Sequence, residues 1–322
     1  MMGAAAAPAA GPSPQHERTG ARRAAAWARR LAQWGILAYL LHRVWGLGWQ
    51  EVLRALPVQP AFYLIGLALF AALPIGELLG YRRLLPLPAA GGLRALLRKR
   101  TYNKEILGYS GEVLFYFWVW RDLGVPERTA FHAVKANNVV STLCSTLWAL
   151  AALAAMLAWG DLPAVRDRFP TAGSHLAAGL SAVAIAVLAL VLFRRQLLGV
   201  PPRTALWLGG VHLGRLALVS TLRIAQWASV LPDVPLAAWF GLLACEIAIT
   251  RLPFLPGKDL VFAGAVVDLA PAAGVPAAPM LAMLVAQGVL DRLLNSAVLL
   301  FPAGREARDV AATRSPSPAP GS

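Results

Sequence analysis

The chain has 322 residues, of which 58% are hydrophobic and 14% are charged, and its formal net charge is +14 at pH 7. Several apolar runs approach about 20 residues, the length at which a helix crosses a hydrocarbon core about 30 Å thick. This composition excludes an ordinary soluble domain. The positive charge does not indicate nucleic-acid binding, because the basic residues cluster beside the apolar runs, as they do in membrane proteins that follow the positive-inside rule.

The hydropathy pattern predicts an all-α fold, a polytopic integral membrane bundle of about seven to eight transmembrane helices with two broken, re-entrant segments. The bundle is expected over residues 24–302, between a disordered basic N-terminal tail at 1–23 and a disordered C-terminal tail at 303–322. The expected elements are helices at 24–41, 60–81, 136–159, 175–193, 204–230, 236–250 and 277–301, a short interfacial helix at 48–56, and the broken segments at 105–121 and 252–270.

Basic residues predict the orientation of the chain. A loop expected at 82–104 carries seven Lys and Arg residues, and Arg194, Arg195 and Arg203 mark a second basic loop. Both loops are assigned to the cytoplasm together with the N-terminus. The C-terminus is outside if both broken segments re-enter on the cytoplasmic side, and inside if one of them crosses fully. The predicted location is the inner membrane of a bacterium.

The two broken segments share a pattern. In each, a Gly stands beside a charged residue, a short apolar stretch follows, and a Gly-Val-Pro turn precedes a long apolar helix. The charged positions are Gly111-Glu112 and Pro256-Gly257-Lys258-Asp259, and the turns are Gly124–Pro126 and Gly274–Pro276. Interrupted segments at corresponding places in the two halves of a membrane protein are typical of a transport site. We therefore expect the two segments to face each other around one charged cavity.

Polar residues also interrupt two of the expected apolar helices at membrane depth. Charge is costly there and faces a bundle interior or a wet cavity. At about 100° per residue, the polar residues of each helix fall on one face. They are His212, Arg215, Arg223 and Gln226 in the helix at 204–230, and Gln287, Asp291 and Asn295 in the last helix, where Arg292 follows Asp291. Each face predicts either a substrate site or pairing between helices.

The candidate substrate-binding residues come from these two faces and from the broken segments. Basic side chains suit the phosphate of a lipid headgroup, and carboxylates balance their charge or meet a cationic headgroup. A helix that starts after Pro256-Gly257 would also direct its positive end towards an anion. The predicted site residues are Glu112, Arg215, Arg223, Arg251, Lys258, Asp259, Asp291 and Arg292.

Familiar catalytic motifs are missing from the sequence. It contains no HExxH, no P-loop, no GxSxG and no Cys/His zinc set, so no catalytic residue, metal site or cofactor is predicted. An enzyme is therefore not favoured. Cys144 and Cys245 lie far apart in apolar segments, which predicts a packing role for both.

Several of these residues also carry a family resemblance. A Gly-Glu pair followed by a basic residue, a Pro-Gly loop ahead of the last helices, a late Arg in the final helix and a basic pair after the second helix occur together. These motifs are Gly111-Glu112 with Arg121 and Gly124, Pro256-Gly257, Arg292, and Arg82-Arg83. Over about residues 26–302, the chain resembles the lysylphosphatidylglycerol synthase transmembrane-domain family of flippase-like integral membrane proteins.

The chain departs from the pattern of that family in three respects. Tyr109-Ser110 stand where the family has a proline, and Lys258-Asp259 replace further glycines. The glutamate expected after the second loop is absent, and the nearest carboxylates are those of Asp259 and Asp268. Family members with a fused aminoacyl-transferase domain make a lipid and move it across the bilayer. No such domain is recognised here, so the resemblance implies the translocation step alone.

The leading prediction is a lipid translocase. A phospholipid or polyprenyl-linked headgroup would enter a polar cavity between the broken segments, and the partners would be membrane lipids with anionic headgroups. Two alternatives stay open. One is a membrane-embedded enzyme that acts on lipid-linked substrates with Glu112 or Asp259 as a base. The other is a non-transporting scaffold for a partner synthase or glycosyltransferase.

Overall fold

The computed structural model describes residues 49–105, 109–159, 199–251 and 258–300, with isolated positions before residue 49. Within these ranges the regular elements are all helical, which confirms the all-α prediction. They are α2 (Trp49–Arg54), α3 (Pro60–Arg82), α4 (Ala89–Glu105), α5 (Ser110–Phe117), η1 (Trp118–Asp122), α6 (Glu127–Trp159), α10 (Pro202–Ala228), α11 (Leu236–Arg251), α12 (Lys258–Ala272) and α13 (Ala277–Leu300). The helices predicted at 24–41 and 175–193 and both tails lie outside the continuous described ranges.

Four of the described helices, α3, α6, α10 and α13, are long and apolar enough to cross a membrane, and α11 is a shorter apolar helix. These helices indicate a membrane protein. The predicted boundaries of α3, α10, α11 and α13 agree with the structure to within two residues. α6 begins at Glu127, well before the predicted start at 136, because Pro126 sets up a helix start that the polar first turns conceal from a hydropathy reading.

The prediction of a loop over residues 82–104 is wrong, because Ala89–Glu105 form α4. The many cations made this segment resemble a positive-inside loop. Lys, Arg, Leu and Ala are nevertheless good helix formers. The helix packs against α3, α5 and α13, and its buried residues include Lys99 and Thr101. Part of the positive charge therefore lies inside the bundle.

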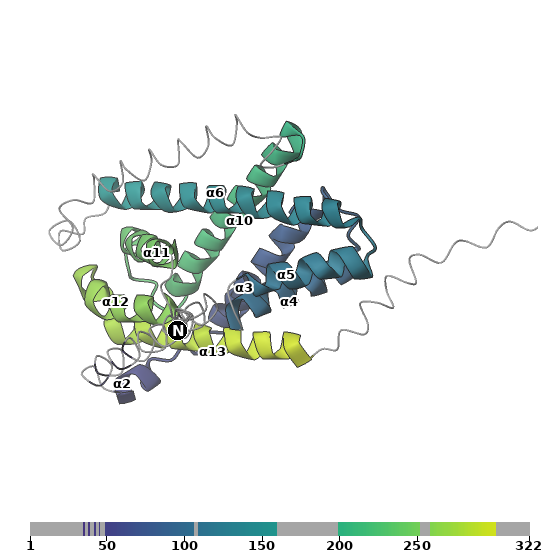
Figure 1. Ribbon diagram of the computed structural model, residues 1–322. Coiled ribbons are helices and arrows are strands. Elements are labelled where there is room, and N and C mark those ends of the chain that lie inside the picture. The colour runs from purple at the N-terminus through teal and green to yellow at the C-terminus, as the bar shows by residue number, and fades with distance from the viewer. Residues whose placement is uncertain are drawn as a thin grey trace, which may run out of the picture.

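The first broken segment corresponds to the tight pairing of α5 with α4, which lie side by side in Figure 1. The backbone N–H of Gly111 donates to Oδ1 of Asn103 at 2.7 Å, and Oγ of Ser110 donates to the carbonyl of Tyr102 at 3.0 Å. A Cβ atom on Gly111 would collide with the backbone carbonyl of Lys99. The Gly of the Gly-Glu pair is therefore required by the close approach of two helices.

Both Gly-Val-Pro turns end one helix and start the next in the same way. Gly124 and Gly274 have φ of 65° and 72°, the left-handed conformation typical of a residue just after a helix. The valine after each Gly is buried, and its N–H returns to a carbonyl of the preceding helix. The pattern predicted from the sequence is thus confirmed as a pair of equivalent helix–helix corners.

Glycines on α3 let neighbouring helices approach closely. A Cβ atom at Gly66 would meet Leu290 and Gln287 of α13, and a Cβ atom at Gly76 would meet the side chain of Arg215 on α10. In Figure 1, α10 lies along α3 and α6 crosses α10. α3 is therefore a central helix of the described bundle.

The apolar side chains form two main cores. One joins Phe62 of α3 to residues of α10, α11, α12 and α13. The other joins Tyr81, at the opposite end of α3, to residues of α4, α5, η1 and the start of α6. Along α3, the buried charge of Glu77 and the contacts of Gly66 fall between these cores. Most of the buried polar side chains lie in this intermediate zone.

The close approach at Gly111 leads to a prediction. Gly111→Ala places a Cβ atom against a backbone carbonyl that cannot move alone, so we expect a loss of about 1–3 kcal/mol of stability. Gly214→Ala on α10 is the matched control, because no atom lies within 4 Å of its added Cβ. Thermal unfolding of both variants in detergent checks this. Equal melting temperatures for the two variants would contradict the close pairing of α4 with α5.

Candidate functional site

A buried charge cluster joins α3, α4 and α5. Nζ of Lys99 lies 2.6 Å from Oε1 of Glu77 and 3.5 Å from Oε1 of Glu112. The side chains of Lys99 and Glu77 are only 2% and 10% exposed. The rings of Tyr81 and Phe115 lie 5.5 and 5.9 Å from the same ammonium group. One cation of α4 thus holds a carboxylate of α3 and a carboxylate of α5.

The surroundings keep Lys99 protonated. Burial alone would lower the pKa of its ammonium group, but the charges of Glu77, Tyr81 and Glu112 and the hydrogen bond to Glu77 raise that pKa above its ordinary value. Oε2 of Glu112 is buried and has no hydrogen-bond partner among the described residues. A bare buried carboxylate oxygen is costly, which makes Glu112 the least satisfied member of this cluster.

Asp291 of α13 is the centre of a second cluster. Its Oδ2 accepts a hydrogen bond of 2.7 Å from Nζ of Lys104, and its Oδ1 lies 3.5 Å from Nη2 of Arg100. Nε2 of Gln287 donates to the same Oδ1 at 3.2 Å. The guanidinium of Arg100 also stacks over the ring of Phe70 at 4.1 Å. Asp291 is therefore held by two cations and one amide.

Asn295 extends this cluster along α13 by one turn. Its Oδ1 accepts hydrogen bonds from Nη1 of Arg100 at 2.9 Å and from Oγ1 of Thr101 at 3.3 Å. Its Nδ2 donates to Oε1 of Glu105 at 2.7 Å. Burial lowers the pKa of Arg100, against the raising effect of Asp291, but a guanidinium stays charged in proteins. The polar face predicted on α13 is thus matched by a polar face on α4.

Glutamine side chains connect α13 to α10. Nε2 of Gln226 donates to Oε1 of Gln287 at 2.5 Å and to the carbonyl of Phe62 at 3.1 Å. Beyond Gln226, Arg223 donates to Oε1 of that glutamine at 3.2 Å and lies 3.4 Å from Glu246 of α11. We call the residues of this continuous network the polar seam; they are Arg100, Lys104, Arg223, Gln226, Glu246, Gln287, Asp291 and Asn295.

The structure brings some of the predicted site residues into the polar seam. Asp291 and Arg223 belong to it, and Asp259, whose side chain is 81% exposed, approaches its edge at 3.7 Å from Nζ of Lys104. Glu112 reaches α4 through Lys99 rather than through the seam. In the described residues, Glu112 and Asp291 lie in two separate charge clusters, which meet α4 through Lys99 and through Arg100 with Lys104. The cavity expected between the broken segments stays a prediction.

Other predicted site residues lie apart from the seam. The stem of Arg215 packs against Gly76 of α3, and Nζ of Lys258 donates to the carbonyl of Thr250 at 2.6 Å. Arg292 is exposed, and the side chain of Arg251 lies outside the described part of the chain. A substrate-binding role for these four residues stays a prediction.

The sequence reading missed the cations that hold the two clusters together. Lys99, Arg100 and Lys104 were assigned to a cytoplasmic loop, although each forms an ion pair with a carboxylate of another helix. One signal for these cations was present in the sequence, because carboxylates stand in apolar helices, where their charge has to be neutralised. Glu77 and Asp291 each need a cation from elsewhere in the chain.

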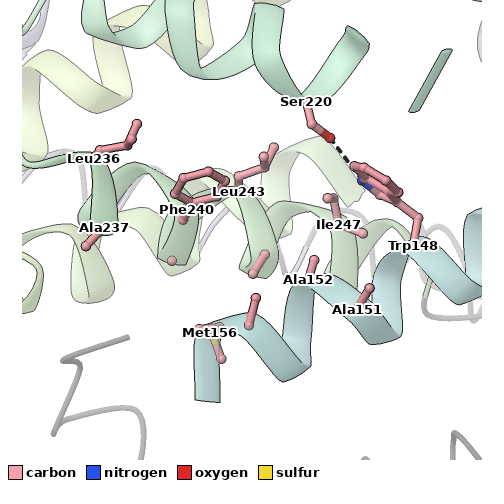
Figure 2. A pocket seen from close by; sticks show the side chains of 13 residues that line it. Trp148, Ala151, Ala152, Met156, Ser220, Leu236, Ala237, Phe240, Leu243 and Ile247 are labelled. Carbon is pink, nitrogen blue, oxygen red and sulfur yellow. Dashed lines mark hydrogen bonds between the residues drawn. The ribbon is translucent and has the colours of Figure 1, made fainter. Parts of the chain in front are cut away.

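An apolar groove lies beside the polar seam, between α6, α10 and α11. Its volume is about 410 Å³, and its lining is almost entirely apolar. Its only polar side chains are those of Trp148 and Ser220, which hydrogen-bond to each other at 3.0 Å (Figure 2). The lining residues are Trp148, Ala151, Ala152, Ala155, Met156, Ser220, Leu236, Ala237, Phe240, Gly241, Leu243, Ala244 and Ile247.

No group of three or more His, Cys, Asp or Glu side chains that could hold a metal ion occurs among the described residues. Comparisons with protein-family models, with curated proteins and with solved structures found no match for this chain.

The Glu77–Lys99 pair predicts a large loss of stability in one variant and a partial recovery of stability in a second. Lys99→Met leaves two buried carboxylates without their cation, which costs about 3–5 kcal/mol when a buried pair is broken. Adding Glu77→Gln removes one of those charges and should recover part of the loss. Chemical denaturation of both variants, with Arg83→Met as the exposed control, measures these differences.

The pH dependence of that loss follows from the raised pKa of Lys99. A raised pKa in the folded state means that the stabilisation is fully present below the ordinary lysine pKa of about 10.4 and is lost only as the pH rises above it. The wild type should therefore keep the stabilisation from Lys99 from about pH 7 to pH 10 and stay more stable than Lys99→Met throughout this window. A difference that disappears within this window would show that Lys99 is not a protonated partner.

Proposed function

We propose that this chain is a multi-pass membrane protein that translocates a lipid with a phosphate-containing headgroup. The observation that carries the proposal is the polar seam, which joins α4, α10, α11 and α13 through a network of buried and partly exposed side chains. Two of these helices, α10 and α13, are long and apolar enough to be membrane spans. Ionisable side chains inside a membrane bundle are costly and mark substrate or ion pathways.

The chemistry of the seam suits a phosphate. Arg100 and Lys104 both contact the carboxylate of Asp291, so the seam already contains an oxyanion held by a guanidinium and an ammonium group. A phosphate accepts hydrogen bonds from the same donors, and arginine binds it with particular geometric specificity. In this proposal, Asp291 occupies the place of the headgroup while the seam is closed, and the headgroup replaces it as the seam opens.

The membrane arrangement that accompanies this proposal follows from the sequence. α5 with η1, and α12, are too short to cross a bilayer comfortably, which supports re-entrant segments at these two places. The full bundle would have about seven to eight spans, and the basic segments would place the N-terminus in the cytoplasm of a bacterial cell. The resemblance to flippase-like proteins supports the same activity.

A second candidate function is a non-transporting membrane scaffold for an enzyme of lipid or glycan synthesis. The observation that favours it is that the seam cations Arg100, Lys104 and Arg223 are each paired with a carboxylate and packed. A network that is only structural would need no opening. The two candidates differ in whether the purified protein moves lipid at all.

The translocase proposal predicts the effect of removing a seam cation. Lys104→Gln takes away one of the two cations that contact the oxyanion, so the translocation rate of an anionic phospholipid should fall about tenfold or more. The half-exposed side chain of Lys104 makes misfolding of this variant less of a concern than at Lys99. A fluorescent phosphatidylglycerol reporter in proteoliposomes, with a membrane-impermeant quencher, measures the rate.

Arg83→Gln is the control, because Arg83 is an exposed cation near the start of α4. It should translocate lipid at the wild-type rate. Translocation by the wild-type protein no faster than in protein-free vesicles would support the scaffold. Equal rates for Lys104→Gln and Arg83→Gln would remove the seam from the pathway.

A further inference from the structure

The apolar groove has the shape of a slot along two helices. It follows α6 from Trp148 to Met156 and α11 from Leu236 to Ile247, distances of about 12 and 16 Å at 1.5 Å per residue. Figure 2 shows side chains of α6 and α11 on opposite walls, with Leu236 and Ala237 at one end and Trp148 and Ile247 at the other. Phe240 and Leu236 are more than half exposed. The slot is therefore an open apolar surface on helices of a membrane protein.

Small side chains create the hollow. Much of the wall on α6 is formed by alanines, and Gly241 and Ala244 face it from α11. Large side chains at these positions would fill the space, as they do in the cores. An apolar hollow of this kind does not need water, because it has no unsatisfied polar group to bind it. The chemistry that fits it is a hydrocarbon chain.

The end of the groove at Trp148 and Ile247 lies next to the polar seam. Ser220, which lines the groove, is three residues before Arg223 on α10, so the two side chains are neighbours on that helix. On α11, Glu246 stands beside Ile247, and Arg223 and Glu246 form the 3.4 Å ion pair at the end of the seam. Among the described residues, the apolar slot thus ends near a cation that pairs with one carboxylate, Glu246, and donates to one amide, Gln226.

We propose that the groove and Arg223 together form a binding site for one anionic membrane phospholipid. An acyl chain of the lipid lies in the apolar groove, and the phosphate meets Arg223 in place of Glu246. The charge at the end of the groove matches an anionic headgroup, and the slot matches the chain attached to it. The site lies where a lipid would enter the polar seam. It therefore identifies an anionic phospholipid as the substrate of the proposed translocation and this end of the groove as its entry point.

This inference rests on the proposed function for the role of the site as an entry point, but the binding of the lipid is tested on its own. The protein is reconstituted into vesicles that contain phosphatidylglycerol with a photoactivatable group in one acyl chain. After illumination, mass spectrometry identifies the labelled residues. We expect labels on the groove faces of α6 and α11, at residues such as Ala152 and Phe240.

Three variants on one helix separate a site from general contact with lipid. Ala152→Phe fills the groove and should lower the labelling of α11 about tenfold. Ala155→Phe fills the same groove one turn away and serves if the first variant does not fold. Ala154→Phe is the matched control, because Ala154 is on α6 but does not line the groove. It should be labelled like the wild type.

Charge variants test the headgroup end. Arg223→Gln should abolish the preference for phosphatidylglycerol over a phosphatidylcholine probe with the same chain. Glu246→Gln should increase that preference several-fold, because it removes the carboxylate that competes with the phosphate for Arg223. A purely structural ion pair predicts instead that both variants weaken the labelling in the same way.

Labels spread evenly over α6 and α11, and unaffected by Ala152→Phe, would show only general contact with the bilayer and would overturn the proposal. If the groove is labelled as expected but the wild type translocates no lipid, the binding site stands and the proposed translocase fails. If translocation occurs with no labelling of the groove, the translocase stands and this entry site fails.

Discussion

The structure depends on the neutralisation of cations that α4 carries into an apolar bundle. Lys99 holds carboxylates of α3 and α5, while Arg100 and Lys104 hold Asp291 of α13. A buried charge without its partner costs several kcal/mol, so none of these helices can be placed independently of the others. The glycines of α3 and Gly111 of α5 allow the helix backbones to approach closely around these charge pairs. Charge pairing and small residues therefore determine the same arrangement.

This arrangement connects structure to the proposed function. A packed apolar core would have been a simpler way to join four helices, yet the intermediate zone is filled with ion pairs and amides that run from α4 to α11. Such a network can exchange a carboxylate for another oxyanion without losing its donors. The apolar groove lies beside the Arg223–Glu246 end of this network, so a hydrocarbon chain can be bound where a headgroup would begin to replace a carboxylate. The two features together describe a site for an amphipathic anion.

Much of the fold and of the candidate site could be predicted from the sequence. The remainder could not, for a physical reason. Periodicity placed Gln287, Asp291 and Asn295 on one face, because three polar residues in an apolar helix stand out at about 100° per residue. The two Gly-Val-Pro corners could be predicted equally well. The cations of α4 were misread because a basic segment between apolar runs satisfies the positive-inside rule whether it lies outside the bundle or within it. Lys104 and Asp291 are 187 residues apart, and a single sequence does not indicate which distant residues form a pair.

The central claim is that α4 lies inside the bundle and is not an exposed basic loop. Thr101 tests it most directly, because its side chain is fully buried and uncharged, so that Thr101→Cys leaves the ion pairs intact. Cys144 and Cys245 are first replaced by alanine, and the rate of reaction with a polar maleimide is then measured in the folded protein. We predict that Thr101→Cys reacts at least about a hundredfold more slowly than Arg83→Cys, since burial blocks access to the thiol. Equal reaction rates at the two positions would contradict the account.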